Sequence, residues 1–127
     1  MVEKNLNNTA HAIGKSIKSS QQKVNLVLRS IRGLPVENAV NVLQFSRRRI
    51  SNIILKILNS AISNAENNHQ LDIDILKVSE AYCGKGMVMK RWRARAKGRP
   101  GRINKFLTNI TIKVVEDQTK NTTKESK

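Results

Sequence analysis

The feature that most constrains this chain is a basic segment, residues 85–105, which contains nine lysines and arginines and no aspartate or glutamate. The nine cations are Lys85, Lys90, Arg91, Arg93, Arg95, Lys97, Arg99, Arg102 and Lys105. They supply nine of the fifteen net positive charges of the chain. Because cations alternate with small or flat residues at its centre, the segment is too polar to join a hydrophobic core. It must lie outside the core, and it needs an anionic partner.

Length and composition limit what the rest of the chain can form. The 127 residues suffice for one domain, and the low aromatic content of 3% predicts a modest core of aliphatic side chains. A net charge of +15 makes nucleic acid the first partner to consider, because phosphate neutralises such charge. An anionic membrane is the second, although no apolar run reaches the roughly 20 residues that span a bilayer.

Two β-strands are predicted to flank the basic segment. Apolar residues alternate from Leu71 through Ile73 and Ile75 towards Val78, and alternation returns from Ile103 to Val114. Glycine and proline between them predict a long hairpin, about residues 85–108, with its tip near residues 97–101. The apolar positions are odd up to Leu107 and even from Ile110, which predicts a bulge or twist near residues 108–109.

The N-terminal half predicts a short strand followed by a helix. Residues 10–18 alternate weakly, with Ile13 and Ile17 on one side. Ser19 and Gln22 have the spacing of a capping box, which predicts a helix start there. Its apolar face follows at helical spacing in Val24, Val27, Leu28 and Ile31, and Gly33 is expected to end it.

Two more helices are predicted before the second strand. Pro35 suits the first turn of one whose apolar positions are Val36, Ala39, Val40 and Leu43. Ser46 can cap the other, which we expect to be the most buried because its apolar stripe is wide. That stripe comprises Ile50, Ile53, Ile54, Ile57, Leu58, Ala61, Ile62 and Ala65.

These elements predict an α+β fold in which three helices pack on a small antiparallel sheet with a long projecting β-hairpin. Residues 10–116 would form a single domain that binds nucleic acid. Residues 1–9 are expected to be a flexible N-terminus, and the polar residues 117–127 a disordered tail.

Three arginines, Arg47, Arg48 and Arg49, are expected in the first turn of the third helix, where the helix dipole disfavours positive charge. A phosphate bound there would turn this conflict into a site, held by the arginines and the free backbone N–H groups. The alternative is a solvated basic turn.

Catalytic and metal-binding constellations are not evident in the sequence. His11 and His69 lie far apart, and the pair Asp72 and Asp74 is a weak metal signal, so no metal and no cofactor are expected. Cys83 is the only cysteine, which fits a reducing compartment and a half-buried strand position. The N-terminus lacks the apolar core of a signal peptide, so we expect the protein to remain where it is made.

Binding chemistry remains. Arginine binds phosphate through several N–H donors in one plane. An exposed Trp92 could stack on a base or instead pack against the opposite arm. A second basic set, on the first strand and helix, suggests that nucleic acid surrounds the protein. The predicted nucleic-acid-binding residues are therefore Lys15, Lys18, Lys23, Arg29, Arg32, Arg47, Arg48, Arg49 and Trp92, together with the nine cations of the basic segment.

Four motifs, in their order and spacing over residues 10–116, resemble the bacterial-type large-subunit ribosomal protein twenty-two family. They are Gln22-Lys23-Val24 with Ile31-Arg32-Gly33; Ser60-Ala61-Ile62-Ser63-Asn64-Ala65-Glu66-Asn67; Leu71-Asp72-Ile73-Asp74 with Leu76-Lys77-Val78; and Met89-Lys90-Arg91 followed by Arg95-Ala96-Lys97-Gly98-Arg99. Trp92, Arg93 and Pro100-Gly101 depart from the family pattern at the hairpin.

The resemblance implies a non-enzymatic constituent of the large ribosomal subunit whose hairpin passes through ribosomal RNA and lines the nascent-peptide exit tunnel. It implies that the hairpin stretch associated with macrolide resistance contains Met89, Lys90 and Arg91, and that Arg95, Ala96, Lys97, Gly98 and Arg99 lie near the tunnel constriction. The implied partners are large-subunit ribosomal RNA, neighbouring ribosomal proteins and the nascent peptide, with no homo-oligomer and no membrane. The expected location is the cytoplasm, or an organelle if the gene is organellar.

Three rival functions are considered at this point. An architectural DNA-binding protein also combines a helical body with basic β-arms, although that class usually dimerises and deforms duplex DNA. A peripheral membrane protein would need a basic amphipathic helix, which these helices do not provide. An enzyme is the weakest alternative.

Overall fold

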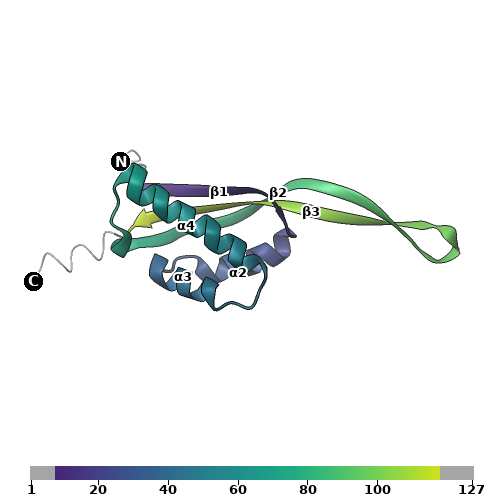
Figure 1. Cartoon of the computed structure of the whole chain (residues 1–127), viewed down its shortest axis with the longest axis horizontal. Helices are drawn as coiled ribbons and strands as arrows, with labels where there is room; N and C mark the ends of the chain where they lie inside the picture. The colour runs from purple at the N-terminus through teal and green to yellow at the C-terminus, as the bar shows by residue number, and fades with distance from the viewer. Residues whose placement is uncertain (1–7, 118–127) are drawn as a thin grey trace, which may run out of the picture.

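The structure, a computed structural model, describes residues 8–117 as an α+β body from which a long β-hairpin projects (Figure 1). In chain order the elements are β1 (Thr9–Lys18), α2 (Gln21–Ile31), α3 (Val36–Gln44), α4 (Ile50–His69), the 3₁₀ turn η1 (Ile73–Ile75), β2 (Leu76–Ala94), the 3₁₀ turn η2 (Ala96–Gly98) and β3 (Pro100–Glu116). The expected fold class is confirmed. Residues 1–7 and 118–127 lie outside the described residues, so the expectations for the two ends stay predictions.

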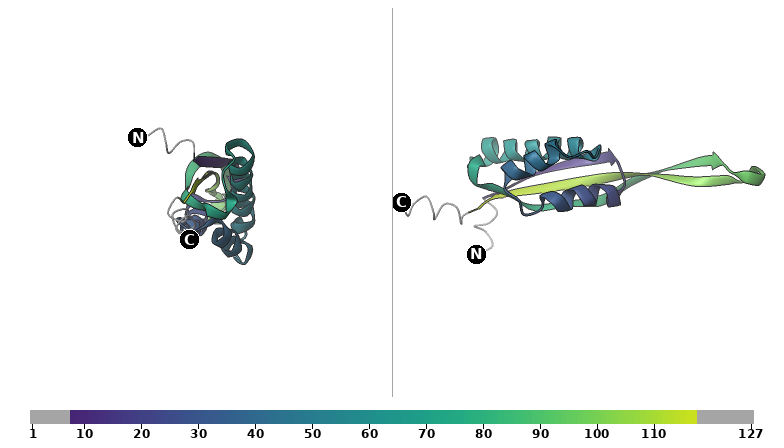
Figure 2. Two further views of the ribbon diagram at one scale, coloured as in Figure 1. Left: turned by 90° about the vertical axis from the view of Figure 1, so that its left-hand side faces the viewer. Right: turned by 90° about the horizontal axis from the view of Figure 1, so that it is seen from below.

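The sheet is antiparallel, with the strand order β1-β3-β2, so β3 is the central strand. Its even-numbered residues Thr108, Ile110, Ile112 and Val114 are fully buried, as alternation predicts for the face that meets the helices. Helices α2, α3 and α4 cover this face, and β2 and β3 continue well past them (Figures 1 and 2). The core therefore ends where the hairpin begins.

The predicted helical faces are confirmed. Val24, Val27, Leu28 and Ile31 of α2 are buried, as are Val36, Ala39 and Leu43 of α3. Helix α4 has the longest buried stripe, and Ile53, Leu55 and Ile62 pack against the core at its edges. Gly33 follows α2 with a φ of 77°, a left-handed conformation that glycine adopts without steric cost.

Both predicted serine caps are wrong. The N-cap of α2 is Ser20, which makes no side-chain cap hydrogen bond, and the backbone N–H of Ser19, which a capping box would pair with Gln22, donates instead to the Ile17 carbonyl at 2.9 Å. The N-cap of α4 is Arg49, and the Ser46 hydroxyl instead accepts from the Ser51 hydroxyl at 2.8 Å. Short loop contacts displaced both serines from their expected roles.

The second strand begins later than predicted. Ile73 and Ile75 lie in η1, and Ile73 is 38% exposed, because the Asp72 side chain accepts a hydrogen bond from the Asp74 backbone N–H and closes a turn. The strand starts at Leu76, whose side chain is buried. The apolar alternation that predicted one strand therefore covers two elements, the turn η1 and then the strand β2.

The predicted change of inward face near residues 108–109 is confirmed, but the extra residues lie on the partner strands. The β2–β3 register shifts between Lys85 and Val88, and the β1–β3 register shifts between Gly14 and Ile17. Ser16 has a φ of 58° in this second bulge, and its N–H donates to the Asn109 side chain at 3.0 Å. Both bulges flank the point at which the hairpin leaves the body.

The β1 bulge also corrects the prediction for the first strand. Ala10 and Ala12 are its buried residues, whereas Ile13 is 52% exposed. Ile17 lies after the bulge and packs against the core, so Ile13 and Ile17 do not share one inward face. The extra residue at Ser16 reverses the alternation between them.

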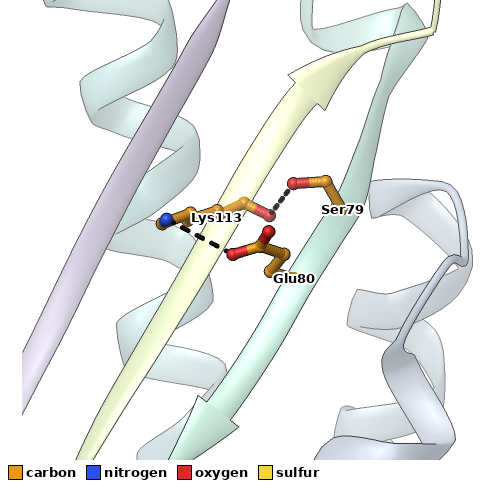
Figure 3. A network of polar contacts seen from close by, with 3 residues as sticks. All are labelled: Ser79, Glu80 and Lys113. Carbon is orange, nitrogen blue, oxygen red and sulfur yellow. Dashed lines mark hydrogen bonds and ion pairs between the residues drawn. The ribbon is translucent and has the colours of Figure 1, made fainter. Parts of the chain in front are cut away.

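A further register shift lies between Val78 and Glu80. There the Ser79 hydroxyl donates to the Lys113 carbonyl at 3.2 Å, and the Lys113 ammonium lies 3.3 Å from the Glu80 carboxylate (Figure 3). Both charged side chains are partly exposed, so this pair adds little stability and mainly ties β2 to β3.

The hairpin tip is a short turn of five residues, Arg95 to Arg99. The Arg95 N–H donates to the Arg99 carbonyl at 3.0 Å, and Lys97 and Gly98 both have positive φ, at 64° and 68°. Pro100 and Gly101, which we expected in the turn, are instead the first residues of β3 and pair with Ala94 and Arg93. Proline is tolerated as the first residue of a strand.

Candidate nucleic-acid interface

All nine cations of the basic segment are exposed. Cross-strand partners share a face of the two-stranded ribbon, and Lys90 pairs with Asn104, Trp92 with Arg102, and Arg91 with Ile103. One face of the arm therefore presents Lys90 and Arg102, and the other presents Arg91, Arg93 and Lys105. Positive charge covers both faces, an arrangement that suits an arm enclosed by phosphate on both sides.

Trp92 combines the two alternatives left open by its sequence position. The guanidinium of Arg102, on the opposite strand, lies 5.6 Å from the centre of the indole ring, a cation–π contact across the hairpin. Trp92 nevertheless remains 64% exposed. The uncovered part of the ring can still stack on a base.

At the base of the hairpin, basic side chains from four separate parts of the chain line one groove, of about 380 Å³. Lys18 ends β1, Lys23 lies in the first turn of α2, Arg49 precedes α4 and Lys105 lies on β3. The Arg49 guanidinium also donates to the Lys18 carbonyl at 3.1 Å. We call this the hairpin-base groove.

The hairpin-base groove also carries an aromatic side chain. Phe106 lines it and is 41% exposed. No aspartate or glutamate is among its described lining residues, and α2 begins at its edge with Ser20 as an N-cap that makes no side-chain hydrogen bond. Cations, free backbone donors and an aromatic surface are the groups that hold phosphate and stack on bases.

The three arginines before α4 lie outside its first turn, contrary to the prediction. Arg47 and Arg48 belong to the preceding loop, and Arg49 is the N-cap residue. All three are exposed, so the phosphate site expected there stays a prediction. The structure adds that Arg49 faces the hairpin-base groove.

The second basic set is divided in the structure. Lys15, Lys18, Lys23 and Arg29 are exposed. Arg32 is exposed as well, but its guanidinium also donates to the Ala81 carbonyl at 2.6 Å and to the Asn25 side chain at 2.7 Å, and its contact with nucleic acid stays a prediction. Only the part of its side chain that remains exposed is available to a partner.

Acidic residues lie at the other end of the body. The described carboxylates are Glu37, Glu66, Asp72, Asp74, Glu80, Glu116 and Asp117. They belong to the start of α3, the end of α4, η1, the start of β2 and the end of β3. These segments lie at the end of the body away from the hairpin, so the described carboxylates are separated from the basic arm along the long axis (Figure 1).

The structure also describes the surroundings of Cys83 and bears on the questions of a metal site and a membrane span. Cys83 is half-buried, and its thiol lies 3.6 Å from the Gln21 carbonyl. Burial raises the pKa of this thiol, while the nearby charge of Arg32 lowers it. Within residues 8–117 there is no cluster of three histidine, cysteine or acidic side chains that could hold a metal, and no helix long and apolar enough to cross a membrane.

Comparisons with known proteins agree with this architecture. Residues 12–115 match the family model of ribosomal protein L22p/L17e. The large ribosomal subunit protein uL22 of Rhodospirillum rubrum is 59% identical over 107 residues, which cover 84% of this chain and 85% of that protein. The same-named protein of Rhizobium etli is 52% identical over 111 residues, covering 87% and 86%.

Another protein of that name, from Cereibacter sphaeroides, is 56% identical over 107 residues, covering 84% of this chain and 85% of that protein. The matched region contains all three helices, almost the whole sheet and the hairpin. The chain therefore belongs to the ribosomal protein L22p/L17e family.

Proposed function

We propose that this protein is a structural, non-enzymatic constituent of the large ribosomal subunit and that its basic surfaces bind large-subunit ribosomal RNA. Its relatives at 52% to 59% identity are large ribosomal subunit proteins by name. The main support for RNA binding is the arm itself, because cations lie on both of its faces and residues 85–105 contain no carboxylate.

The RNA-binding surface would extend from the arm onto the body. The hairpin-base groove joins Lys105 of the arm to Lys18, Lys23 and Arg49 of the body. Phosphate contacts to these groups would fix the position and direction of the arm without reading sequence. Lys15, Arg29, Arg47 and Arg48 would add contacts around the body.

The arm would pass through RNA and reach the nascent-peptide exit tunnel. Met89, Lys90 and Arg91 would lie along the tunnel, and Arg95, Ala96, Lys97, Gly98 and Arg99 would form the turn closest to the peptide. Because a two-stranded ribbon is marginally stable in water, the arm would become rigid when RNA encloses it. It would then hold separate RNA segments together during assembly.

Charge reversal at the tip tests this role. Replacing Arg95, Lys97 and Arg99 with glutamate should leave the body folded, because none of the three side chains contributes to the core. The variant should impair assembly of the large subunit or change its responses to macrolides and to stalling peptides. Circular dichroism, gradient profiles and drug-sensitivity assays measure these effects.

Normal assembly together with unchanged macrolide and stalling responses would contradict the role of the arm. The matched control replaces three lysines of the C-terminal segment, Lys120, Lys124 and Lys127, with glutamate, which changes the charge equally. This control should assemble like the parent protein.

A second candidate function, architectural binding of DNA, uses the same kind of basic arm. Competition binding at matched salt separates the two. We expect folded large-subunit ribosomal RNA to compete better than duplex DNA. Tighter binding to duplex DNA would overturn the ribosomal proposal.

A further inference from the structure

The acidic end of the body contains an apolar groove that the RNA-binding proposal does not use. It has a volume of about 400 Å³ and lies between α3, α4, η1 and the start of β2. Its apolar lining includes Val40, Ile62, Ile73 and Leu76. Ile73 is 38% exposed, so part of this surface is open to solvent. We call it the acidic-end groove.

Carboxylates lie in and beside the acidic-end groove. Glu37 and Asp74 are exposed and line it, and Glu66 lies one helical turn beyond Ile62 on the same side of α4. No lysine or arginine is among its described lining residues. On a chain with a net charge of +15, the two lining carboxylates give this groove local negative charge, which favours a cationic partner over RNA.

We infer that the acidic-end groove docks a basic polypeptide segment of a neighbouring ribosomal protein, with an apolar side chain seated in the groove and flanking lysines or arginines paired with Glu37 and Asp74. The inference rests on the proposed function, which supplies the neighbouring proteins. Apolar lining with an acidic rim fits this class of ligand, because each part of the peptide meets its complement.

The C-terminal segment of the chain itself fits the groove poorly. The Asp117 N–H donates to the Ile75 carbonyl at 2.8 Å, so the chain leaves the described region beside η1. Residues 118–127 contain lysines but no large apolar side chain. They could pair with the rim but could not fill the apolar lining.

Photo-crosslinking within purified large subunits tests the inference directly. Ile73 is replaced by a photo-reactive amino acid, and crosslinked peptides are identified by mass spectrometry after irradiation. We expect a crosslink to one ribosomal protein, at a peptide with an apolar residue between lysines or arginines. Crosslinks only to ribosomal RNA, only to residues of this chain, or to nothing would overturn it.

A charge variant supplies an independent readout. Glu37→Gln combined with Asp74→Asn should increase the loss of the crosslinked protein from salt-washed subunits about five-fold, since two partly exposed ion pairs would be removed. The control, Asn59→Lys with Asn67→Lys, adds the same charge on exposed positions of α4 that do not line the groove. Equal loss from both variants would contradict a role of the rim.

An apolar variant tests the other half of the site. Ile73→Lys should release the same partner about as strongly, whereas Ile13→Lys, at an exposed position on β1, should not. Failure of the parent protein to sediment with large subunits would refute the proposed function. Normal sedimentation with no effect at Ile73 would refute only the docking site.

Discussion

At the scale of single residues, a buried threonine connects the hairpin strand to the start of the first helix. Thr108 is fully buried, and its hydroxyl donates to the Ser19 carbonyl at 2.5 Å. Thr108→Val should lower the free energy of unfolding by about 1–3 kcal/mol, because the carbonyl loses its partner while the shape is kept. Urea unfolding measures this. Thr111→Val, at a half-buried position on the other face of β3, is the control. Equal stability of the Thr108 variant and the parent would contradict the assigned hydrogen bond.

The glycines at the hairpin base provide a matched pair. A Cβ atom at Gly86 would lie 2.8 Å from the Leu107 carbonyl oxygen, whereas a Cβ at Gly84 would meet nothing within 4 Å. Gly86→Ala should therefore destabilise the protein by about 1–3 kcal/mol, and Gly84→Ala should be close to neutral. Thermal unfolding of both variants checks this. Equal melting temperatures would show that the bulge is not tightly packed.

Cys83 gives a prediction about pH. Burial raises its thiol pKa above the ordinary value of 9.0, so the folded state keeps a proton that the unfolded state has lost over a window above that value. The contribution of Cys83 to stability therefore falls as pH rises through this window. Alkylation by iodoacetamide should begin at higher pH in the folded protein than in urea. Coincident pH profiles would contradict the burial of the thiol.

At the scale of elements, the arm extends beyond the hydrophobic core, so we expect its tip side chains to contribute little to folding. Replacing Arg95, Lys97 and Arg99 with glutamine should change the free energy of unfolding by less than about 0.5 kcal/mol. Binding to large-subunit ribosomal RNA should weaken, and the slope of log K against log salt should decrease by about 2–3, as expected for three lost phosphate contacts. Filter binding at several salt concentrations measures the slope.

The control for this measurement replaces Lys120, Lys124 and Lys127 with glutamine, an equal loss of charge outside the arm. The slope should then remain close to that of the parent. If both triple variants reduce the slope equally, total charge rather than the arm governs binding.

The elements that sequence predicted well are those set by hydrophobic periodicity. The buried faces of α2 and α4 and the change of inward face near Thr108 are all explicit in the spacing of apolar residues. The errors arose where single side chains or backbone dihedrals act locally. Asp72 closes a turn before β2. Ser16 and Lys97 adopt positive φ values, which serine and lysine rarely do, so the sequence did not predict them.

Of the candidate site, the arm could be predicted from the sequence and the hairpin-base groove could not. The arm is contiguous in sequence, so its charge was visible at once. The hairpin-base groove was not, because Lys18, Lys23, Arg49 and Lys105 come together only when β1, α2, α4 and β3 pack. The hydrogen bond from Arg32 to the Ala81 carbonyl was likewise not predicted, because the two residues are 49 positions apart along the chain.

At the scale of the whole molecule, the distribution of charged residues follows the long axis. The basic arm projects from one end of the body, and the segments that contain the described carboxylates lie at the other (Figures 1 and 2). In the arrangement that we propose, the protein would contact RNA along the arm and the hairpin-base groove, and a neighbouring protein at the acidic-end groove. The two kinds of partner would then fix its orientation within the subunit.

Sedimentation tests the central claim most directly. The tagged protein is expressed in cells, and lysates are separated on sucrose gradients after a high-salt wash. The account predicts that the protein sediments with the large ribosomal subunit at about one copy per subunit and resists the wash. Recovery at the top of the gradient, with the small subunit alone or with DNA would contradict it.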